Sequence, residues 1–91
     1  MNDVAEAIVQ LKNRFGLHVR TASMVAKAAL RFRSQIWISD EHQNANARSV
    51  VEMTSLGARQ GRQLKLKAQG PDAKDAVKEI RLLFETSFGE Q

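Results

Sequence analysis

The amino-acid sequence predicts an α/β (α+β) fold, an open-faced sandwich in which a four-stranded sheet carries three helices on one face. Two observations predict it. Four segments alternate apolar side chains with others, as half-buried strands do, and three segments repeat apolar residues every three or four positions, as amphipathic helices do. The segments follow in the order βαββαβα, and each has one apolar face. Packing all three helices against one side of one sheet buries every such face.

A strand and a helix account for the first third of the chain. Residues 5–11 alternate apolar side chains with others, which is the pattern of a half-buried strand. Residues 13–16 break this alternation. From residue 19 to residue 32 the apolar side chains recur at three- and four-residue steps, so we predict a helix over that range.

A hairpin is predicted in the middle of the chain. Residues 35–40, QIWISD, are rich in β-branched and aromatic side chains, with Ile36 and Ile38 on one face and Trp37 on the other. Residues 43–47 predict a short third strand that pairs back on this one. The turn between the two strands lacks the glycine that such turns usually contain, which weakens the hairpin prediction.

Two helices and a strand complete the predicted order. A short helix capped by Ser49 covers residues 50–56 and ends at Gly57. Residues 64–68 alternate again and predict the fourth strand. A last amphipathic helix follows over residues 73–84, after a Gly-Pro-Asp sequence of the kind that often precedes a helix.

The composition excludes several classes of protein. A hydrophobic content of 43% and a charged content of 26% are those of an ordered globular chain, and the absence of cysteine excludes disulfides and thiolate zinc sites. No apolar run approaches the roughly 18 residues of a membrane helix, and MNDVAEAIVQ has no signal-peptide features. We therefore expect a cytoplasmic protein without membrane insertion. We also expect it to be a monomer. Its net charge of +4 favours acidic partners or phosphate.

The stretch FGLHVRTA contains the residues with the clearest chemistry. His18 falls between the first strand and the first helix, where free backbone N–H groups and the helix dipole favour an anion. A free imidazole has a pKa of about 6.5, so it can be unprotonated and nucleophilic at neutral pH. Arg20 has a guanidinium fork that suits phosphate oxygens. The residues alone leave open whether His18 is a phosphate-bearing nucleophile or an exposed loop residue. His42 lies far along the chain in a predicted turn, so no metal site is expected.

Three blocks of the chain resemble the HPr family, the histidine-containing phosphocarriers of the bacterial sugar phosphotransferase system. They are GLHVRTA at residues 16–22, ARSVVEMTSLGARQG at residues 47–61, and the closing amphipathic helix. They occur in order and with the spacing of that family, over nearly the whole chain. The resemblance implies one HPr-like phosphocarrier domain over residues 1–91, with a four-stranded antiparallel sheet, three helices on one of its faces and no cofactor.

The resemblance also implies roles for individual residues. His18 matches the histidine that takes phosphate on Nδ1 from phospho-enzyme I and gives it to IIA domains of sugar permeases. Arg20 matches the arginine beside the phosphohistidine. Ser49 matches the serine that an ATP-dependent HPr kinase/phosphorylase modifies in many bacteria. The expected partner-binding surface consists of Met24, Lys27, Arg48, Val50, Val51 and Thr54.

Two positions depart from the family pattern. Thr21 stands where the family usually has proline, and we expect the change to be tolerated because threonine is acceptable near a helix start. Glu52 stands where glycine or lysine is common. It is expected to complete a Ser-x-x-Glu capping box with Ser49, and its negative charge counts against recognition by the serine kinase.

Two other functions remain open on the sequence. The first is a regulatory carrier of the nitrogen-type phosphotransfer chain, which moves no sugar. The second is a basic module that binds nucleic acid, which is weakened because Trp37 stands without further aromatic residues for stacking, so we expect no nucleic-acid partner. The chain offers no acid/base pair, nucleotide loop or metal cluster of its own. We therefore expect a phosphoryl carrier rather than a turnover enzyme.

Overall fold

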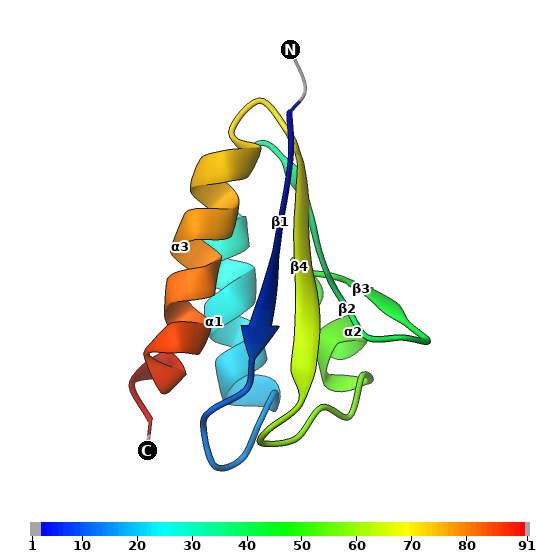
Figure 1. Ribbon diagram of the computed structural model, residues 1–91, viewed down its shortest axis with the longest axis vertical. Helices are drawn as coiled ribbons and strands as arrows, with labels where there is room; N and C mark the ends of the chain where they lie inside the picture. The colour runs from blue at the N-terminus through cyan, green and yellow to red at the C-terminus, as the bar shows by residue number, and fades with distance from the viewer. Residues whose placement is uncertain (1–2, 91) are drawn as a thin grey trace.

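The computed structural model describes residues 3–90 and has the predicted open-faced sandwich (Figure 1). The helices lie together on one face of the sheet, and the element order is the one that the sequence predicts, followed by one short 3-10 helix that was not predicted. The elements are β1 (Asp3–Gln10), α1 (Val19–Ala29), β2 (Gln35–Ser39), β3 (Asn44–Asn46), α2 (Val50–Thr54), β4 (Gln63–Gly70), α3 (Ala73–Glu85) and η1 (Ser87–Gly89).

The four strands form one antiparallel sheet in the order β1-β4-β2-β3. The last strand in the chain, β4, is therefore central and pairs with β1 over eight residues, from Asp3 opposite Gly70 to Gln10 opposite Gln63. Because the pairing continues to Asp3 and Gly70, β1 begins before residue 5 and β4 ends after residue 68, which were the predicted limits. The predicted hairpin is confirmed, with Ile38 of β2 opposite Ala45 of β3.

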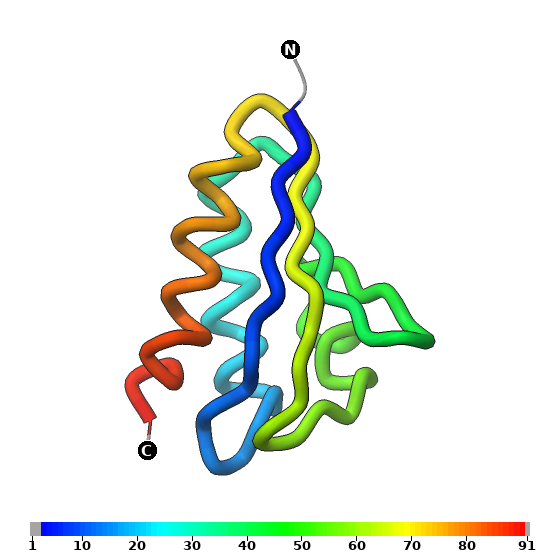
Figure 2. Tube along the Cα trace, in the orientation of Figure 1, coloured from blue at the N-terminus to red at the C-terminus, as the bar shows by residue number. Residues whose placement is uncertain are grey.

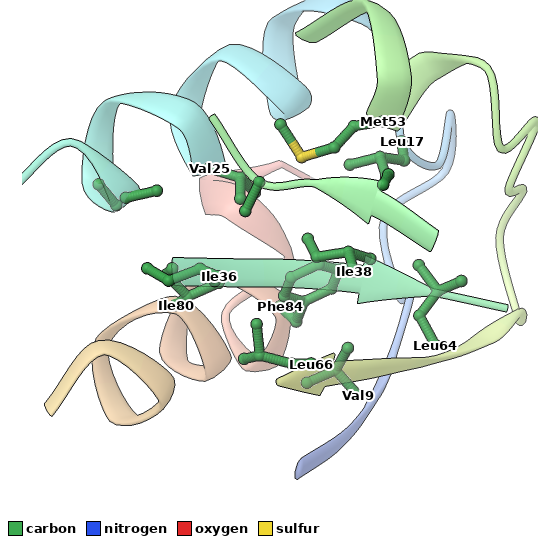
Figure 3. Close-up of a cluster of buried hydrophobic side chains, with 14 of the residues drawn as sticks. Val9, Leu17, Val25, Ile36, Ile38, Met53, Leu64, Leu66, Ile80 and Phe84 are labelled. Carbon is green, nitrogen blue, oxygen red and sulfur yellow. The ribbon is translucent and has the colours of Figure 1, made fainter. Parts of the chain in front are cut away.

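The core lies between the sheet and the helices (Figure 3). Every second residue of the strands points into it, including Ile36, Ile38, Leu64 and Leu66, each at most 2% exposed. From the other side, α3 contributes the large side chains Ile80 and Phe84, whereas α1 contributes mostly alanines. The buried residues of α1 are Thr21, Ala22, Val25, Ala26, Ala28 and Ala29. Small side chains on this face allow α1 to lie close to the sheet.

Two helices end earlier than predicted. Helix α1 ends at Ala29 rather than Phe32, because the N–H groups of Arg31 and Phe32 bond to carbonyls three residues back and tighten the chain into a turn. Helix α2 ends at Thr54 rather than at residue 56. The N–H groups of Leu56 and Gly57 also bond to carbonyls three residues back, so the chain forms a turn after Thr54. The side chain of Leu56 is buried, although Leu56 lies in this turn and not in the helix.

The hairpin turn forms without glycine because Asp40 takes over part of the hydrogen bonding. Its Oδ1 accepts from the N–H of His42 at 2.8 Å and from the N–H of Gln43 at 2.7 Å. An aspartate that binds backbone donors two and three residues on stabilises a turn directly. These two bonds, together with the charge of Arg62, hold the pKa of the Asp40 carboxyl below its usual value.

A second aspartate joins the end of the sheet to the start of α3. Asp72 accepts hydrogen bonds from the N–H and the hydroxyl of Ser34, at 2.9 and 2.6 Å, and from the N–H of Arg33 at 2.9 Å. Gly70 precedes it with a φ of +150°, and a Cβ there would lie 2.6 Å from the Ser34 Cα. The close approach of two segments 38 residues apart therefore requires glycine at one side and a small hydroxyl residue at the other.

We expect Asp72→Ala to destabilise the fold in a pH-dependent way. The hydrogen bond from the Ser34 hydroxyl, followed by the Arg33 N–H, lowers the pKa of Asp72 from 3.8. A lowered folded pKa means that the contribution is fully present above the unfolded pKa and is lost as the pH falls through the folded one. Melting curves followed by circular dichroism should separate the variant from the wild type near neutral pH and converge in acid. Asp75→Ala is the control, and an equal loss in both variants would contradict the assignment.

Candidate functional site

His18 forms the N-cap of α1, where the sequence places it. Its backbone is extended, with φ −114° and ψ −175°, and its side chain is 35% exposed. The ring nitrogen Nδ1 accepts a hydrogen bond from the N–H of Arg20 at 3.2 Å. The imidazole therefore does the work of a capping side chain, and it lies against the positive end of an eleven-residue helix.

The hydrogen bond from the Arg20 N–H defines which nitrogen of a neutral ring holds the lone pair. Because Nδ1 accepts from a backbone N–H, a neutral ring carries its proton on Nε2 and keeps a lone pair on Nδ1. Nε2 lies 3.5 Å from Oε2 of Glu90, at ion-pair distance. A group attached to Nδ1 would meet the Arg20 N–H that now donates to the ring nitrogen.

Thr21 fixes the backbone of His18. Its hydroxyl accepts from the N–H of His18 at 3.1 Å and donates to the carbonyl of Gly16 at 3.0 Å, and its side chain is fully buried. With the Nδ1 bond to Arg20, these contacts form a reciprocal capping box. The threonine thus supplies two bonds that a proline side chain at this position could not supply.

The loop that leads into His18 is held by a close backbone contact. The N–H of Leu17 donates to the carbonyl of Ala58 at 3.0 Å. Gly16 has a φ of +69°, and a Cβ there would lie 2.5 Å from the same carbonyl oxygen. Glycine is therefore required at this point both by the backbone angle and by the space available.

Glu90 is a site residue that the sequence did not predict. Its Oε2 lies 2.5 Å from Nη1 of Arg20, and its Oε1 accepts from Nδ2 of Asn13 at 3.0 Å. The Asn13 bond, followed by the charges of Arg20 and His18, lowers the pKa of the Glu90 carboxyl. No pattern in the sequence relates Glu90 to Arg20, because the two are 70 residues apart and Glu90 follows the last predicted helix.

The short helix η1 carries Glu90 to this position. Phe88 is 2% exposed, and its ring packs on that of Phe84 with 4.9 Å between centroids. Ser87 and Phe88 adopt left-handed backbone angles, with φ of 54° and 55°, which turn the chain after α3. Figure 2 shows this turn at the same end of the molecule as the loop that enters α1.

Exposed apolar side chains lie on α1, on α2 and in the loop that leads into α1. Val51 is 74% exposed, as expected for a contact residue, whereas Val50 is half-buried against the core. Two further exposed apolar residues were not predicted, Phe15 at 71% and Val19 at 66%. The Phe15 ring lies edge-on to that of His18, with 6.4 Å between centroids.

The other expected contact residues differ in what they already bind. Lys27 is exposed and Met24 is half-buried beside the core. Nη2 of Arg48 donates to the carbonyls of Phe32 and Ser34, at 2.6 and 3.0 Å, and the Thr54 hydroxyl bonds back to the carbonyl of Val50. Arg48 and Thr54 therefore have structural roles, which position the segment around α2.

Ser49 caps α2, but the predicted capping box is wrong. The Ser49 hydroxyl accepts from the N–H of Glu52 at 3.1 Å, which is the first half of the box. The carboxylate of Glu52 instead accepts from the N–H of Asn46 at 2.9 Å. The reason is local, because the N–H of Ser49 is already bound to the carbonyl of Asn46 in the preceding turn.

Comparison with known proteins identifies the family. A model described as "PTS HPr component phosphorylation site" matches residues 5–86. The chain belongs to the HPr family. It is 35% identical to the phosphocarrier protein HPr of Treponema pallidum over 91% of this chain and 94% of that one. It is 36% identical to the phosphocarrier protein NPr of Proteus mirabilis over 90% of this chain and 92% of that one.

A solved structure agrees with this assignment. The HPr of Thermoanaerobacter tengcongensis superposes with a TM-score of 0.91 at 39% identity, over 96% of this chain and 98% of that one. The resemblance read from the sequence is thereby confirmed, and the chain is an HPr-type phosphocarrier of the phosphotransferase system.

The described part of the chain holds neither a metal centre nor a membrane-spanning helix. Across residues 3–90, no three His, Asp or Glu side chains come together as a metal site. None of the helices in that range is long and apolar enough to cross a membrane. A hollow of about 510 Å³ lies beside the hairpin and the open face of the sheet, with Trp37 and Lys67 in its lining and neither His18 nor Arg20.

We expect Thr21→Val to destabilise the protein by about 1–3 kcal/mol, because it leaves the N–H of His18 without its buried partner. Urea unfolding measures the change. Ser23→Ala is the control, since the Ser23 hydroxyl is exposed and bonds only to the carbonyl of Val19 on its own helix. Equal midpoints for Thr21→Val and the wild type would show that the hydroxyl does not hold the cap.

Proposed function

We propose that the chain accepts a phosphoryl group on Nδ1 of His18 from phospho-enzyme I and passes it to IIA domains of sugar permeases. The observation that carries this proposal is the position of Nδ1 at the N-cap of α1, 3.2 Å from the Arg20 N–H. The Nδ1 lone pair attacks phosphorus as the bond from phosphorus to the donor breaks. The N–H of Arg20, released from Nδ1, can then donate to a phosphoryl oxygen, and the helix dipole favours the added charge.

Arg20 is the residue we assign to stabilise the phosphoryl group. Its guanidinium comes from the first turn of α1 and already holds a carboxylate oxygen at 2.5 Å, so the fork is within reach of an anion at the ring. An arginine fork binds the oxygens of a phosphoryl group in much the same way. We expect the carrier itself to need no cofactor, because the Arg20 guanidinium and the start of α1 supply the positive charge that faces the phosphoryl group.

The partner-binding surface surrounds His18 and combines apolar and basic groups. Val51, Val19 and Phe15 are exposed and apolar, while Arg14 and Lys27 are exposed and basic. Apolar contacts without deep burial suit a transient complex, and positive charge speeds encounters with acidic partners. Met24 and Val50 support this surface from beneath, and Arg48 and Thr54 hold its backbone. Enzyme I and the IIA domains would use the same surface in turn.

A second candidate function is a regulatory carrier of the nitrogen-type chain. The observation that favours it is the 36% identity to an NPr, which is no lower than the 35% identity to an HPr. The site geometry serves both roles equally, because each begins with a phosphoryl group on the same histidine. Mixing the phosphorylated carrier with a sugar-type and a nitrogen-type IIA domain tells the two apart by which domain becomes labelled.

Labelling with phosphoenolpyruvate and enzyme I tests the carrier function. We expect intact-mass measurement to find one acid-labile phosphoryl group on the wild type and none on His18→Ala. His42→Ala is the matched control and should label as the wild type does, since His42 lies in the hairpin turn. A wild type that takes up no phosphoryl group, or a His18→Ala variant that does, would refute the assignment.

For Ser49 we propose a regulatory phosphorylation site that Glu52 weakens. A phosphoryl group on Ser49, at the N-cap of α2, would be stabilised by the positive end of the helix dipole. The Glu52 carboxylate, one turn away, would repel it. Glu52→Gln is expected to raise the initial rate of Ser49 phosphorylation by an HPr kinase/phosphorylase several-fold. Glu41→Gln, on the hairpin, should leave the rate unchanged. No difference between Glu52→Gln and the wild type would remove the role given to Glu52.

A further inference from the structure

We propose that the Glu90 carboxylate is a built-in competitor of the phosphoryl group, which holds Arg20 in the empty carrier and so makes the phosphorylated carrier a better donor. This inference rests on the proposed function, because it concerns the same histidine. It starts from the closest charge contact of the site, the 2.5 Å between Oε2 of Glu90 and Nη1 of Arg20. The same oxygen lies 3.5 Å from Nε2 of His18.

The carboxylate is held in place on its other side by a buried amide. Nδ2 of Asn13 donates to Oε1 of Glu90 at 3.0 Å and to the carbonyl of Gly16 at 2.7 Å. Both partners are acceptors, so the orientation of the amide follows from its contacts. Asn13 is fully buried, and the side chain of Glu90 is 11% exposed. These contacts therefore fix the position of the Glu90 carboxylate.

The backbone that presents Glu90 is also fixed. Left-handed angles at Ser87 and Phe88 are unfavourable for residues with a side chain, and here they are retained because the Phe88 ring is buried against Phe84. The N–H of Glu90 donates to the carbonyl of Ser87 at 2.8 Å, which closes the turn. The buried ring of Phe88 thus fixes the backbone that positions Glu90 two residues later.

The energetic consequence follows from competition for one guanidinium. In the empty carrier, Arg20 is neutralised by Glu90. After phosphoryl transfer to Nδ1, a dianion and the carboxylate lie beside the same arginine, so either the Glu90 contact loosens or the two anions repel each other. Glu90 therefore stabilises the empty form relative to the phosphorylated form. The equilibrium constant for phosphorylation of His18 is lowered, and the constant for transfer to the next protein is raised by the same factor. The two factors are equal because Glu90 changes only the free-energy difference between the empty and the phosphorylated carrier.

The contact with the ring has the opposite tendency but is the weaker one. Oε2 of Glu90 lies on the Nε2 side of the ring, so its attraction to an N–H at Nε2 of a phosphorylated ring would favour the phosphorylated form. At 3.5 Å this contact lies beyond a good hydrogen bond, whereas the Arg20 contact lies at 2.5 Å. The loss of the Arg20 contact therefore decides the sign of the effect.

The equilibrium of phosphoryl transfer with enzyme I, phosphoenolpyruvate and pyruvate tests this proposal. We expect Glu90→Gln to shift the equilibrium toward phosphorylated carrier by about two- to fivefold, the range of a partly exposed ion pair. The shift should shrink at high salt. Glu85→Gln is the matched control, because Glu85 pairs with Arg81 on α3 and is not in contact with His18. An unchanged equilibrium in Glu90→Gln, or a shift toward the empty form, would overturn the proposal.

A binding measurement separates this proposal from the carrier function. Titration of the unphosphorylated protein with inorganic phosphate, followed by the amide resonance of Arg20, needs no partner protein. We expect Glu90→Gln to bind phosphate more tightly than the wild type and Glu85→Gln to match the wild type. Tighter binding without any labelling of the wild type would remove the carrier function and keep the competition. Equal phosphate binding by all three proteins would count against Glu90 as a competitor.

Discussion

The hydrogen bond from the Arg20 N–H to Nδ1 of His18 joins the fold and the chemistry of this protein. A helix start leaves backbone donors without partners, and here a ring nitrogen takes one of them. The nitrogen that completes the helix is thus the one that is expected to carry the phosphoryl group. Either state satisfies the donor, since a phosphoryl oxygen can replace the lone pair. The helix start need not reorganise when the charge arrives.

The elements around this bond limit how the ring can move. Thr21 holds the backbone of His18 from one side, and the contact between Leu17 and Ala58 holds the preceding loop from the other. Asn13 and Glu90 add a third support through side chains. These contacts come from segments that are far apart in the chain, so the site depends on the closed sandwich rather than on the FGLHVRTA stretch alone.

Periodicity and local motifs in the sequence were sufficient to predict the order of the helices and strands and the position of His18 at the start of the first helix. The alternation in β4 and the stripe of α3 reflect which side chains are buried, and burial decides the fold. Contacts that depend on the third dimension could not be found in this way. Glu90 meets Arg20 only because η1 turns the chain back, and Glu52 binds Asn46 because a preceding turn already uses the N–H of Ser49. Asp40 replaced the expected glycine by a side-chain bond that no strand pattern reveals.

The alanine-rich face of α1 has a further consequence for the whole molecule. Ala22 and Ala29 are both fully buried, so nothing between the helix and the strands can be compressed to absorb a larger side chain. A larger side chain at position 29 would require the whole of α1 to tilt or shift. Because a helix is rigid, its other end would move as well. A larger side chain at the far end of α1 would therefore also displace the start of the helix, where the ring of His18 forms the N-cap.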